Sequence, residues 1–252
     1  MSGLPNAENM PSRDSINSES DKRYYDASEG TSEEKIPPFA TVIQRYYSKY
    51  KPLIEKHFQA QKDVRALEMG AGTCCLSLML SDLSCVKEVV CLDISAARMQ
   101  AFVPVAARAI SSRPEKLKFI QSDMGDSLSF DDSSFDLIVF DASLHHTRSI
   151  WRTLAECYRV LAPDGLLVAQ REQYLGMFTS SQKLEQLIDS EEVKNGVSEN
   201  AYLKAQYLYY FRATGFHTRF IPVAENLLQK LLLPFNGLIY SKWVLIAQKK
   251  AF

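Results

Sequence analysis

The feature that most constrains the fold is a short apolar run that ends in a glycine loop, at residues 64–75. The run carries the acid Glu68 and breaks into Gly70-Ala71-Gly72, after which apolar residues recur at helical spacing. Gly70 and Gly72 allow a positive φ and a close approach of the backbone to a ligand, which a Cβ would obstruct. A strand, a tight turn and a helix N-terminus in this order predict a nucleotide-type cofactor pocket in an α/β sheet.

The loop departs from the fingerprint of dinucleotide-binding proteins. That fingerprint has a third glycine, and here Cys75 occupies its position. Glu68 stands two residues before the first glycine. A carboxylate there repels a pyrophosphate and attracts an ammonium group. The loop therefore disfavours an NAD-dependent oxidoreductase.

Composition is that of an ordinary globular protein. The 252 residues allow one large α/β domain or two small ones, and 46% of them are hydrophobic and 23% charged. The net charge of −1 gives no overall field that would attract nucleic acid. The first 35 residues lack the apolar centre of a signal peptide, and no apolar run is long enough to span a bilayer. Five cysteines without metal-binding spacing suit a reducing cytoplasm, where we expect the protein.

The N-terminal part of the chain changes character at about residue 35. Residues 1–35 are polar and predict a disordered or partly ordered arm, whose C-terminal part could fold onto the domain. Residues 36–60 carry apolar side chains at helical spacing and predict a packing helix ahead of the first strand. The alternative is a lid over the pocket, which would carry one of four tyrosines toward a substrate: Tyr24, Tyr25, Tyr46 or Tyr47.

A second buried strand at residues 89–92 ends in Asp93, which follows Gly70 by 23 residues. An acid about 20 residues after such a loop hydrogen-bonds the ribose hydroxyls of a bound nucleotide. Ribose binding is therefore the role that we predict for Asp93. The alternative is a helix N-cap, because Asp93 and Ser95 also precede a helical pattern at 96–110.

The run at residues 135–141 is almost wholly apolar, which predicts a central parallel strand buried on both faces. Asp141 and then His145-His146 follow at its carboxyl end, where ligands of open α/β sheets bind. Either histidine could accept a proton from a hydroxyl or an amine, because imidazole titrates near neutral pH. The alternative is that both histidines only shape the pocket. No second carboxylate and asparagine accompany Asp141 at a suitable position, so we predict no metal.

Four further matches support a family resemblance, in family order and at family spacing. They are the acid and glycines at 68–72, Asp93 with Asp123-Met124 after the strand at 117–120, Leu-His-His at 144–146, and Leu-Ala-Glu-Cys-Tyr-Arg-Val-Leu-Ala-Pro-Asp-Gly at 154–165. In the last of these, Asp164 replaces the usual glycine. Over residues 64–170 the chain resembles the class I S-adenosylmethionine-dependent methyltransferases of the small-molecule type, close to methyltransferase domain 11.

This resemblance implies a Rossmann-like α/β fold, with a seven-stranded, mostly parallel sheet, helices on both faces and an antiparallel last strand. It implies methyl transfer from S-adenosyl-L-methionine to a small-molecule acceptor. Asp123 would bind the adenine amino group, or else serve as an ordinary turn residue. The implied cofactor-binding residues are Glu68, Gly70, Ala71, Gly72, Asp93, Ile94, Asp123, Met124 and Asp141, and the candidate catalytic residues are His145 and His146.

Residues 36–252 are expected to form one methyltransferase domain. It would comprise an N-terminal helix at 36–60, a cofactor-binding core at 64–170 and a substrate-side region at 171–252, with the last two strands at 216–223 and 243–247. The leucine-rich connection at 224–241 is long for a hairpin and predicts a packed helix, a lid, a dimer surface or a contact with an apolar substrate.

Two other classes of function stay open from the sequence. One is a methyltransferase that modifies tRNA or protein, although near-neutral charge and the lack of an attached RNA-binding module argue against RNA. The other is a non-catalytic relative of the fold that binds a partner. From the sequence we prefer a protein that acts on a small-molecule substrate. It carries no strong signal for nucleic-acid binding, we expect no transmembrane segment, and it could form a homodimer.

Overall fold

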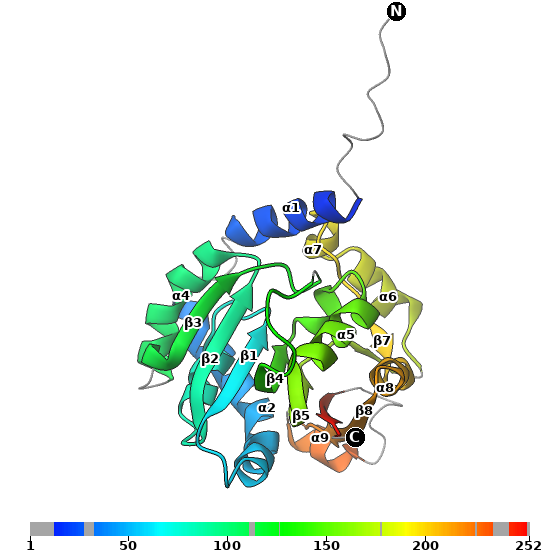
Figure 1. Cartoon of the computed structure of the whole chain (residues 1–252). Helices are drawn as coiled ribbons and strands as arrows, with labels where there is room; N and C mark the ends of the chain where they lie inside the picture. Colours follow the sequence, from blue (N-terminus) through cyan, green and yellow to red (C-terminus); the bar gives the residue numbers. More distant parts are fainter. Residues whose placement is uncertain are drawn as a thin grey trace, which may run out of the picture.

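A seven-stranded sheet organises the chain. The computed structural model describes residues 13–27, 33–110, 114–125, 127–176, 178–224, 226–233 and 242–250. The strands of the sheet are β1 (Val64–Met69), β2 (Val86–Asp93), β3 (Leu117–Gln121), β4 (Phe135–Asp141), β5 (Leu161–Gln170), β8 (Phe216–Pro222) and β9 (Trp243–Lys249). They lie in the order β3-β2-β1-β4-β5-β9-β8 (Figure 1). The first five are mutually parallel, and β9 runs antiparallel to β5 and β8. The predicted fold is confirmed.

Strands β1 and β4 lie side by side in the middle of the sheet, where the order of the strands reverses. Their side chains are buried except for Arg65 in β1 and the two aspartates of β4, which are partly buried. This is why both read as near-continuous apolar runs, since helices cover both faces of a parallel sheet. In such sheets the ligand lies outside the carboxyl ends of the strands at the reversal point.

Helices on the two faces enclose two separate cores. Helices α2 (Ile36–His57), α3 (Cys75–Ser81) and α4 (Ala96–Ala109) cover one face, and α5 (Ile150–Val160) and α8 (Lys204–Ala213) cover the other. Neighbouring residues of one strand enter different cores, because side chains alternate along a strand. Ala66 of β1 packs in the first core and Leu67 in the second.

The smaller described elements lie outside the seven-stranded sheet and the five helices that cover it. They are α1 (Arg13–Asp26), η2 (Glu33–Lys35), η3 (Pro114–Lys116), η4 (Leu144–His146), β6 (Tyr174–Leu175), α6 (Ser181–Ile188), α7 (Glu191–Lys194), β7 (Tyr202–Leu203) and α9 (Leu227–Leu231). Helix α1, blue in Figure 1, lies across the end of the sheet, from the side of α4 to that of α7. It falls within the segment whose composition predicts a disordered or partly ordered arm. None of the described helices combines the length and apolar character that crossing a membrane requires.

The connection at 224–241 is described only in part. Helix α9 lies within it, and residues 225 and 234–241, on which much of that prediction rests, lie outside the described residues. Leu227, Leu228 and Leu231 of α9 are exposed. The role of this connection stays a prediction.

Candidate active site

A cavity of about 380 Å³ opens at the carboxyl ends of β1, β2 and β4. This volume lies in the range of sites that hold small molecules. Its lining includes every cofactor-binding residue predicted from the sequence, which are Glu68, Gly70, Ala71, Gly72, Asp93, Ile94, Asp123, Met124 and Asp141. Of the two predicted catalytic residues, His146 lines the cavity, whereas His145 is not among its lining residues.

The glycine loop forms the floor of this cavity, and Gly70 is sterically required. Gly70 has a φ of +72°, and a Cβ built on it would lie 2.6 Å from Cβ of Ser143. Ser143 follows β4 and is fixed there, because its hydroxyl donates to the carbonyl of Met69 at 2.6 Å. Gly72 has a φ of +50°, but a Cβ there would meet only ordinary contacts. The close approach of two strand ends therefore excludes any side chain at position 70.

Glu68 is buried at the end of β1 and holds the start of α3. Its carboxylate accepts hydrogen bonds from the backbone amide of Ser77, at 2.8 Å, and from the Ser77 hydroxyl. The N-cap residue of α3, Cys74, makes no side-chain cap, so Glu68 supplies the missing acceptor. Burial raises the pKa of Glu68 well above its ordinary value, and the Ser77 hydrogen bonds oppose that shift. Glu68 thus anchors the first turn of α3 and also faces the cavity.

Asp93 joins the glycine loop to the start of α4. One carboxylate oxygen accepts from the amide of Gly72 at 2.7 Å, and the other accepts from the amide of Ser95 at 2.8 Å. The N-cap itself is Ser95, whose hydroxyl accepts from the amide of Arg98. Burial raises the pKa of Asp93, and the two amide hydrogen bonds counteract this. A carboxylate tied to both neighbours has a fixed position at the cavity wall, which ribose binding requires.

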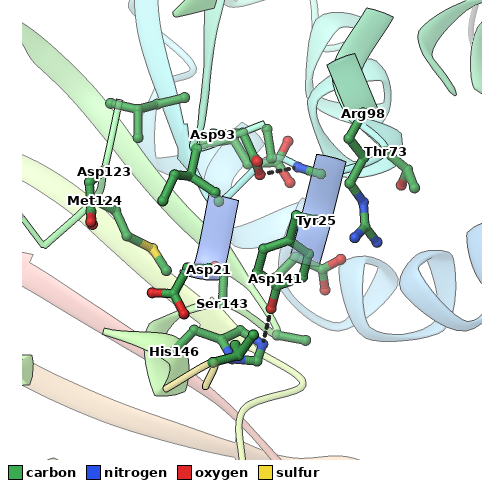
Figure 2. Close-up of a pocket in the computed structure, with 18 of the residues that line it drawn as sticks. Asp21, Tyr25, Thr73, Asp93, Arg98, Asp123, Met124, Asp141, Ser143 and His146 are labelled. Carbon is green, nitrogen blue, oxygen red and sulfur yellow. Dashed lines mark hydrogen bonds between the residues drawn. The ribbon is translucent and has the colours of Figure 1, made fainter. Parts of the chain in front are cut away.

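Asp123 and Met124 follow β3 and line the same cavity (Figure 2). The carboxylate of Asp123 accepts from the amide of Gly125 at 2.8 Å and forms an ion pair with Arg148. Arg148 also lies 3.7 Å from Asp21 of α1. The structure therefore places a cation between two acids at this end of the cavity, which the sequence analysis did not anticipate.

Asp141 is held by a cation as well. Arg171 donates to both of its carboxylate oxygens, at 2.6 and 2.9 Å, and the amide of Gln170 donates to one of them at 2.8 Å. Arg171 stands immediately after β5, beside the end of β4. Within the described residues, the group with metal-ligand geometry does not include Asp141. It consists of His145, His146 and Glu199, whose ligand atoms lie within 4.8 Å of one another.

His145 points into the protein behind the cavity. Its Nδ1 lies 2.6 Å from Glu172, and the same carboxylate accepts from the backbone amides of Ser143, Leu144 and His145 at 3.1–3.3 Å. The side chain of Glu172 is fully buried. This single carboxylate therefore fixes the whole turn that follows β4.

His146 lies at the cavity wall and is held from behind. Its Nδ1 lies 2.9 Å from the carbonyl oxygen of Ser198 and 3.0 Å from Glu199, and its Nε2 lies 3.5 Å from the hydroxyl of Tyr25. Burial acts to lower the pKa of His146, but Glu199 and the Ser198 carbonyl outweigh it, so the pKa is raised. The histidine pair therefore divides into one buried residue and one facing the cavity.

Helix α1 covers the opening. Tyr24 lines the cavity, as do Asp21 and Tyr25, which Figure 2 labels. Asp26 accepts a hydrogen bond from the Ser95 hydroxyl at 2.6 Å. By contrast, Tyr46 and Tyr47 of α2 are buried in the core. The four tyrosines proposed for a lid thus divide between the cavity and the packing interior.

Five residues of the site region escape sequence reasoning: Ser143, Arg148, Arg171, Glu172 and Glu199. Arg171 and Glu172 directly follow the carboxyl end of β5, and Ser143 follows that of β4, so strand position is a usable signal for these three. Arg148 and Glu199 lie in loops away from the strand ends, so strand position gives no signal for them.

Comparisons with known proteins find methyltransferases. Residues 67–169 match a family model described as a methyltransferase domain. Over 104 residues the chain is 32% identical to the demethylmenaquinone methyltransferase of Thermus thermophilus, a match that covers 41% of this chain and 45% of that protein. The chain spans about half the length of the curated relatives it matches.

Solved structures share the fold at low sequence identity. An S-adenosylmethionine-dependent methyltransferase from Methanosarcina mazei superposes with a TM-score of 0.57 at 20% identity, over 80% of this chain and 98% of that one. The [4+2]-cyclase SpnF superposes with a TM-score of 0.59 at 17% identity, over 81% of each chain. At these identities the likeness concerns the fold alone.

Proposed function

We propose that this chain, whose residues 67–169 form a class I S-adenosylmethionine-dependent methyltransferase domain, transfers a methyl group from S-adenosyl-L-methionine to a small-molecule acceptor. The observation that carries the proposal is the convergence of three carboxylates on one cavity. Glu68, Asp93 and Asp123 come from three neighbouring strand ends and line a volume of about 380 Å³ with the glycine loop. Had these side chains pointed away from a common cleft, the cofactor assignment would have failed.

The residues of the cavity suit the cofactor. Gly70 and Gly72 leave the floor without side chains, so that a ligand can lie against the backbone. We propose that Glu68 and Asp141 lie nearest the methionine ammonium, Asp93 binds the ribose, Asp123 with Met124 and Ile94 holds the adenine, and Ala71 contributes to the floor. When bound, the cofactor supplies an activated methyl group on a sulfonium, so the protein mainly has to align the acceptor and exclude water.

We propose that the acceptor side of the site is built around His146. This residue faces the cavity and could take a proton from a hydroxyl or an amine, while His145 supports the same turn from the interior. Asp21, Tyr24 and Tyr25 of α1 cover this end and would exclude water. We also propose transfer without a metal, because Asp141 is already paired with Arg171.

Other functions stay open to test. One solved structure with this fold is named a [4+2]-cyclase, so the fold alone does not assign methyl transfer. Activity on tRNA or protein, or binding of a partner without catalysis, would use the same cavity. The net charge of −1 argues against RNA. A cytoplasmic location and a homodimer are further proposals that follow the sequence analysis.

Thermal unfolding with two ligands separates these possibilities. S-adenosylhomocysteine at 100 times its dissociation constant should stabilise the protein by about 2.7 kcal/mol, and NADH should have no effect. Stabilisation by NADH alone would refute the methyltransferase proposal, and no response to either ligand would favour a partner-binding protein. Incubation with the cofactor and candidate metabolites, followed by mass spectrometry for the gain of one methyl group, would then identify the acceptor.

A further inference from the structure

The feature that carries a further inference is Glu199, in the loop between α7 and β7. Its side chain is almost completely buried, at 8% exposure, and faces both histidines of η4. One carboxylate oxygen lies 3.0 Å from Nδ1 of His146, and the other lies 3.7 Å from Nε2 of His145 and accepts from the amide of Gln173 at 3.2 Å. Glu199 is not among the residues that line the cavity.

The loop that carries Glu199 is fastened to η4 on both sides of this contact. The side-chain amide of Asn200 donates to the carbonyls of His145 and Thr147, at 3.0 and 3.1 Å, and its backbone amide donates to His145 as well. On the other side, the carbonyl of Ser198 lies 2.9 Å from Nδ1 of His146. The position of the carboxylate is thus fixed by the backbone around it.

These contacts determine which ring nitrogen of His146 carries the proton. A carbonyl oxygen only accepts hydrogen bonds, so Nδ1 must be the donor to Ser198. In the neutral ring the lone pair then lies on Nε2, the nitrogen nearest to the Tyr25 hydroxyl at the cavity. A histidine held in this way presents a proton acceptor to the cavity.

We propose that Glu199 is a positioning residue, which together with the Ser198 carbonyl holds His146 in the tautomer with Nδ1 protonated, and whose charge stabilises the imidazolium that forms when Nε2 takes the proton of the methyl acceptor. This inference rests on the proposed function. In that step the proton leaves the hydroxyl or amine for Nε2, the lone pair of the acceptor atom forms the bond to the methyl carbon, and the electron pair of the broken carbon–sulfur bond stays on sulfur. A carboxylate behind an imidazole does this in other enzymes.

His145 and Glu172 form a second pair of the same kind that lacks access to the cavity. Nδ1 of His145 lies 2.6 Å from Glu172, but His145 is absent from the cavity lining. The two pairs have similar chemistry, so the position of the outer nitrogen decides which of them meets a ligand. The Glu172 pair supports the turn, and the Glu199 pair serves the acceptor.

Nuclear magnetic resonance of the imidazoles tests the proposal without an acceptor. The chain has four histidines, so ¹⁵N-histidine labelling of the full chain gives a spectrum that single variants can assign. In the protein saturated with S-adenosylhomocysteine, we expect His146 to be protonated on Nδ1 when neutral. Observation of the opposite tautomer in the wild-type protein would overturn the proposal, and this measurement requires no variant that has to fold.

The Glu199→Gln variant removes the charge and keeps the size. Besides Glu199, the titratable groups that face His146 are Asp21 and Tyr25 of α1, His145 beside it and Glu172 behind it. Loss of the Glu199 charge should lower the pKa of His146 by about one unit, whereas Glu185→Gln, on the exposed surface of α6, should leave it unchanged. An unchanged His146 pKa in Glu199→Gln would overturn the proposal. The thermal response to S-adenosylhomocysteine should survive in this variant, so its loss would implicate the cofactor site instead.

Kinetics and metal binding supply two further arms. Once an acceptor is known, we expect the single variant Glu199→Gln to have a kcat at least tenfold below that of the wild-type protein. Added to the variant His146→Asn, the same substitution should not lower kcat further. Independent effects in the two backgrounds would overturn the proposal. Stoichiometric Zn²⁺ or Mn²⁺ in the purified protein, with release that shifts both imidazole spectra, would also overturn it and assign His145, His146 and Glu199 to a metal site.

Discussion

The two halves of the cavity use buried carboxylates in different ways. On the cofactor half, Glu68 accepts from the amide of Ser77 in the first turn of α3, 9 residues away, and Asp93 accepts from the amide of Gly72 in the loop before α3, 21 residues away. On the acceptor half, Glu172 and Glu199 lie beside imidazoles, and Glu172 also accepts from three backbone amides of the turn after β4, which lie 27 to 29 residues before it. The first half is therefore fixed by the strand–turn–helix units themselves, and the second by contacts between loops.

This difference has an energetic consequence. Where a backbone amide donates to one carboxylate oxygen, the neutral carbonyl oxygen of Gln or Asn can accept that hydrogen bond nearly as well. Where several donors converge on one carboxylate, both of its oxygens are needed as acceptors. We therefore expect the cofactor half to tolerate neutralisation of its acids better in stability, and the acceptor half to lose more. The following predictions test this contrast, from the largest expected effect to the smallest.

Gly70→Ala should cause the largest loss. The new Cβ would meet Cβ of Ser143 at 2.6 Å and would force a side chain into a positive φ, so the free energy of unfolding should fall by about 3 kcal/mol or more. Gly72→Ala is the matched control, since it has the positive φ without the clash and should cost about 1–2 kcal/mol. Chemical denaturation measures both. Equal losses in the two variants would mean that the strand ends can separate.

Asp93→Ala should abolish the stabilisation by S-adenosylhomocysteine. The variant loses the carboxylate that would hold the ribose and the acceptor for the Gly72 amide, so affinity should fall about 100-fold or more. Calorimetric titration of the folded variant measures this. Unchanged affinity would refute the ribose assignment. The free energy of unfolding without ligand, measured in parallel, reports the loss of the amide contacts alone.

The same substitution in the two halves gives the direct comparison. Glu172→Gln would place an amide group against four hydrogen-bond donors and should cost about 2–3 kcal/mol. Glu68→Gln should cost less than about 1 kcal/mol, because Gln retains an oxygen for Ser77 and because the raised pKa of Glu68 shows that burial already disfavours its charge. Urea unfolding of both variants at pH 7 measures the two losses in the free energy of unfolding. The reverse order would contradict the contrast drawn above.

A substitution in helix α1, Asp21→Asn, should change the stability of the protein least, and the change should depend on pH. Burial is the main cause that raises the pKa of Asp21 to about 6, against an opposing effect of Arg148. The pKa of Asp21 in the folded protein exceeds its ordinary value of 3.8. The neutral form of Asp21 therefore contributes its full stabilisation below pH 3.8, and this contribution is lost as the pH rises through about 6. Asp21→Asn should therefore stabilise the protein by about 1 kcal/mol at pH 7.5 and leave it unchanged at pH 3.5. Melting curves at the two pH values measure the difference, and a gain of equal size at both would exclude titration of Asp21.

The cofactor half could be predicted from the sequence because its signals are local. The glycine loop, Asp93 at its expected distance and the apolar run of β4 each define a strand end, and parallel strands bring those ends together. The seven-stranded, mostly parallel sheet and its antiparallel last strand followed from the family resemblance, and the structure bears them out. Residue roles at the cofactor remain predictions, which Asp93→Ala begins to test.

The acceptor half could not be predicted in the same way. Glu199 lies more than 50 residues from the histidines in the sequence, and Asn200 holds its loop against η4. The histidine pair drew attention as a unit, but adjacent residues in η4 point in different directions, so one is buried against Glu172 and the other meets the cavity. The sequence analysis left open that the end of the N-terminal arm folds onto the domain, but it did not predict the helix α1, because this segment has few apolar residues and its docking depends on polar contacts such as Asp26 with Ser95.

The insertion of β9 between β5 and β8 has a consequence for synthesis of the protein. During translation, β5 emerges from the ribosome long before β9, so the hydrogen-bonding edge of β5 lacks its native neighbour while the intervening residues are made. An open strand edge on a nascent chain is a template for wrong pairing. The last strand of the sheet therefore both completes the fold and closes the interval in which the growing polypeptide is most exposed to aggregation.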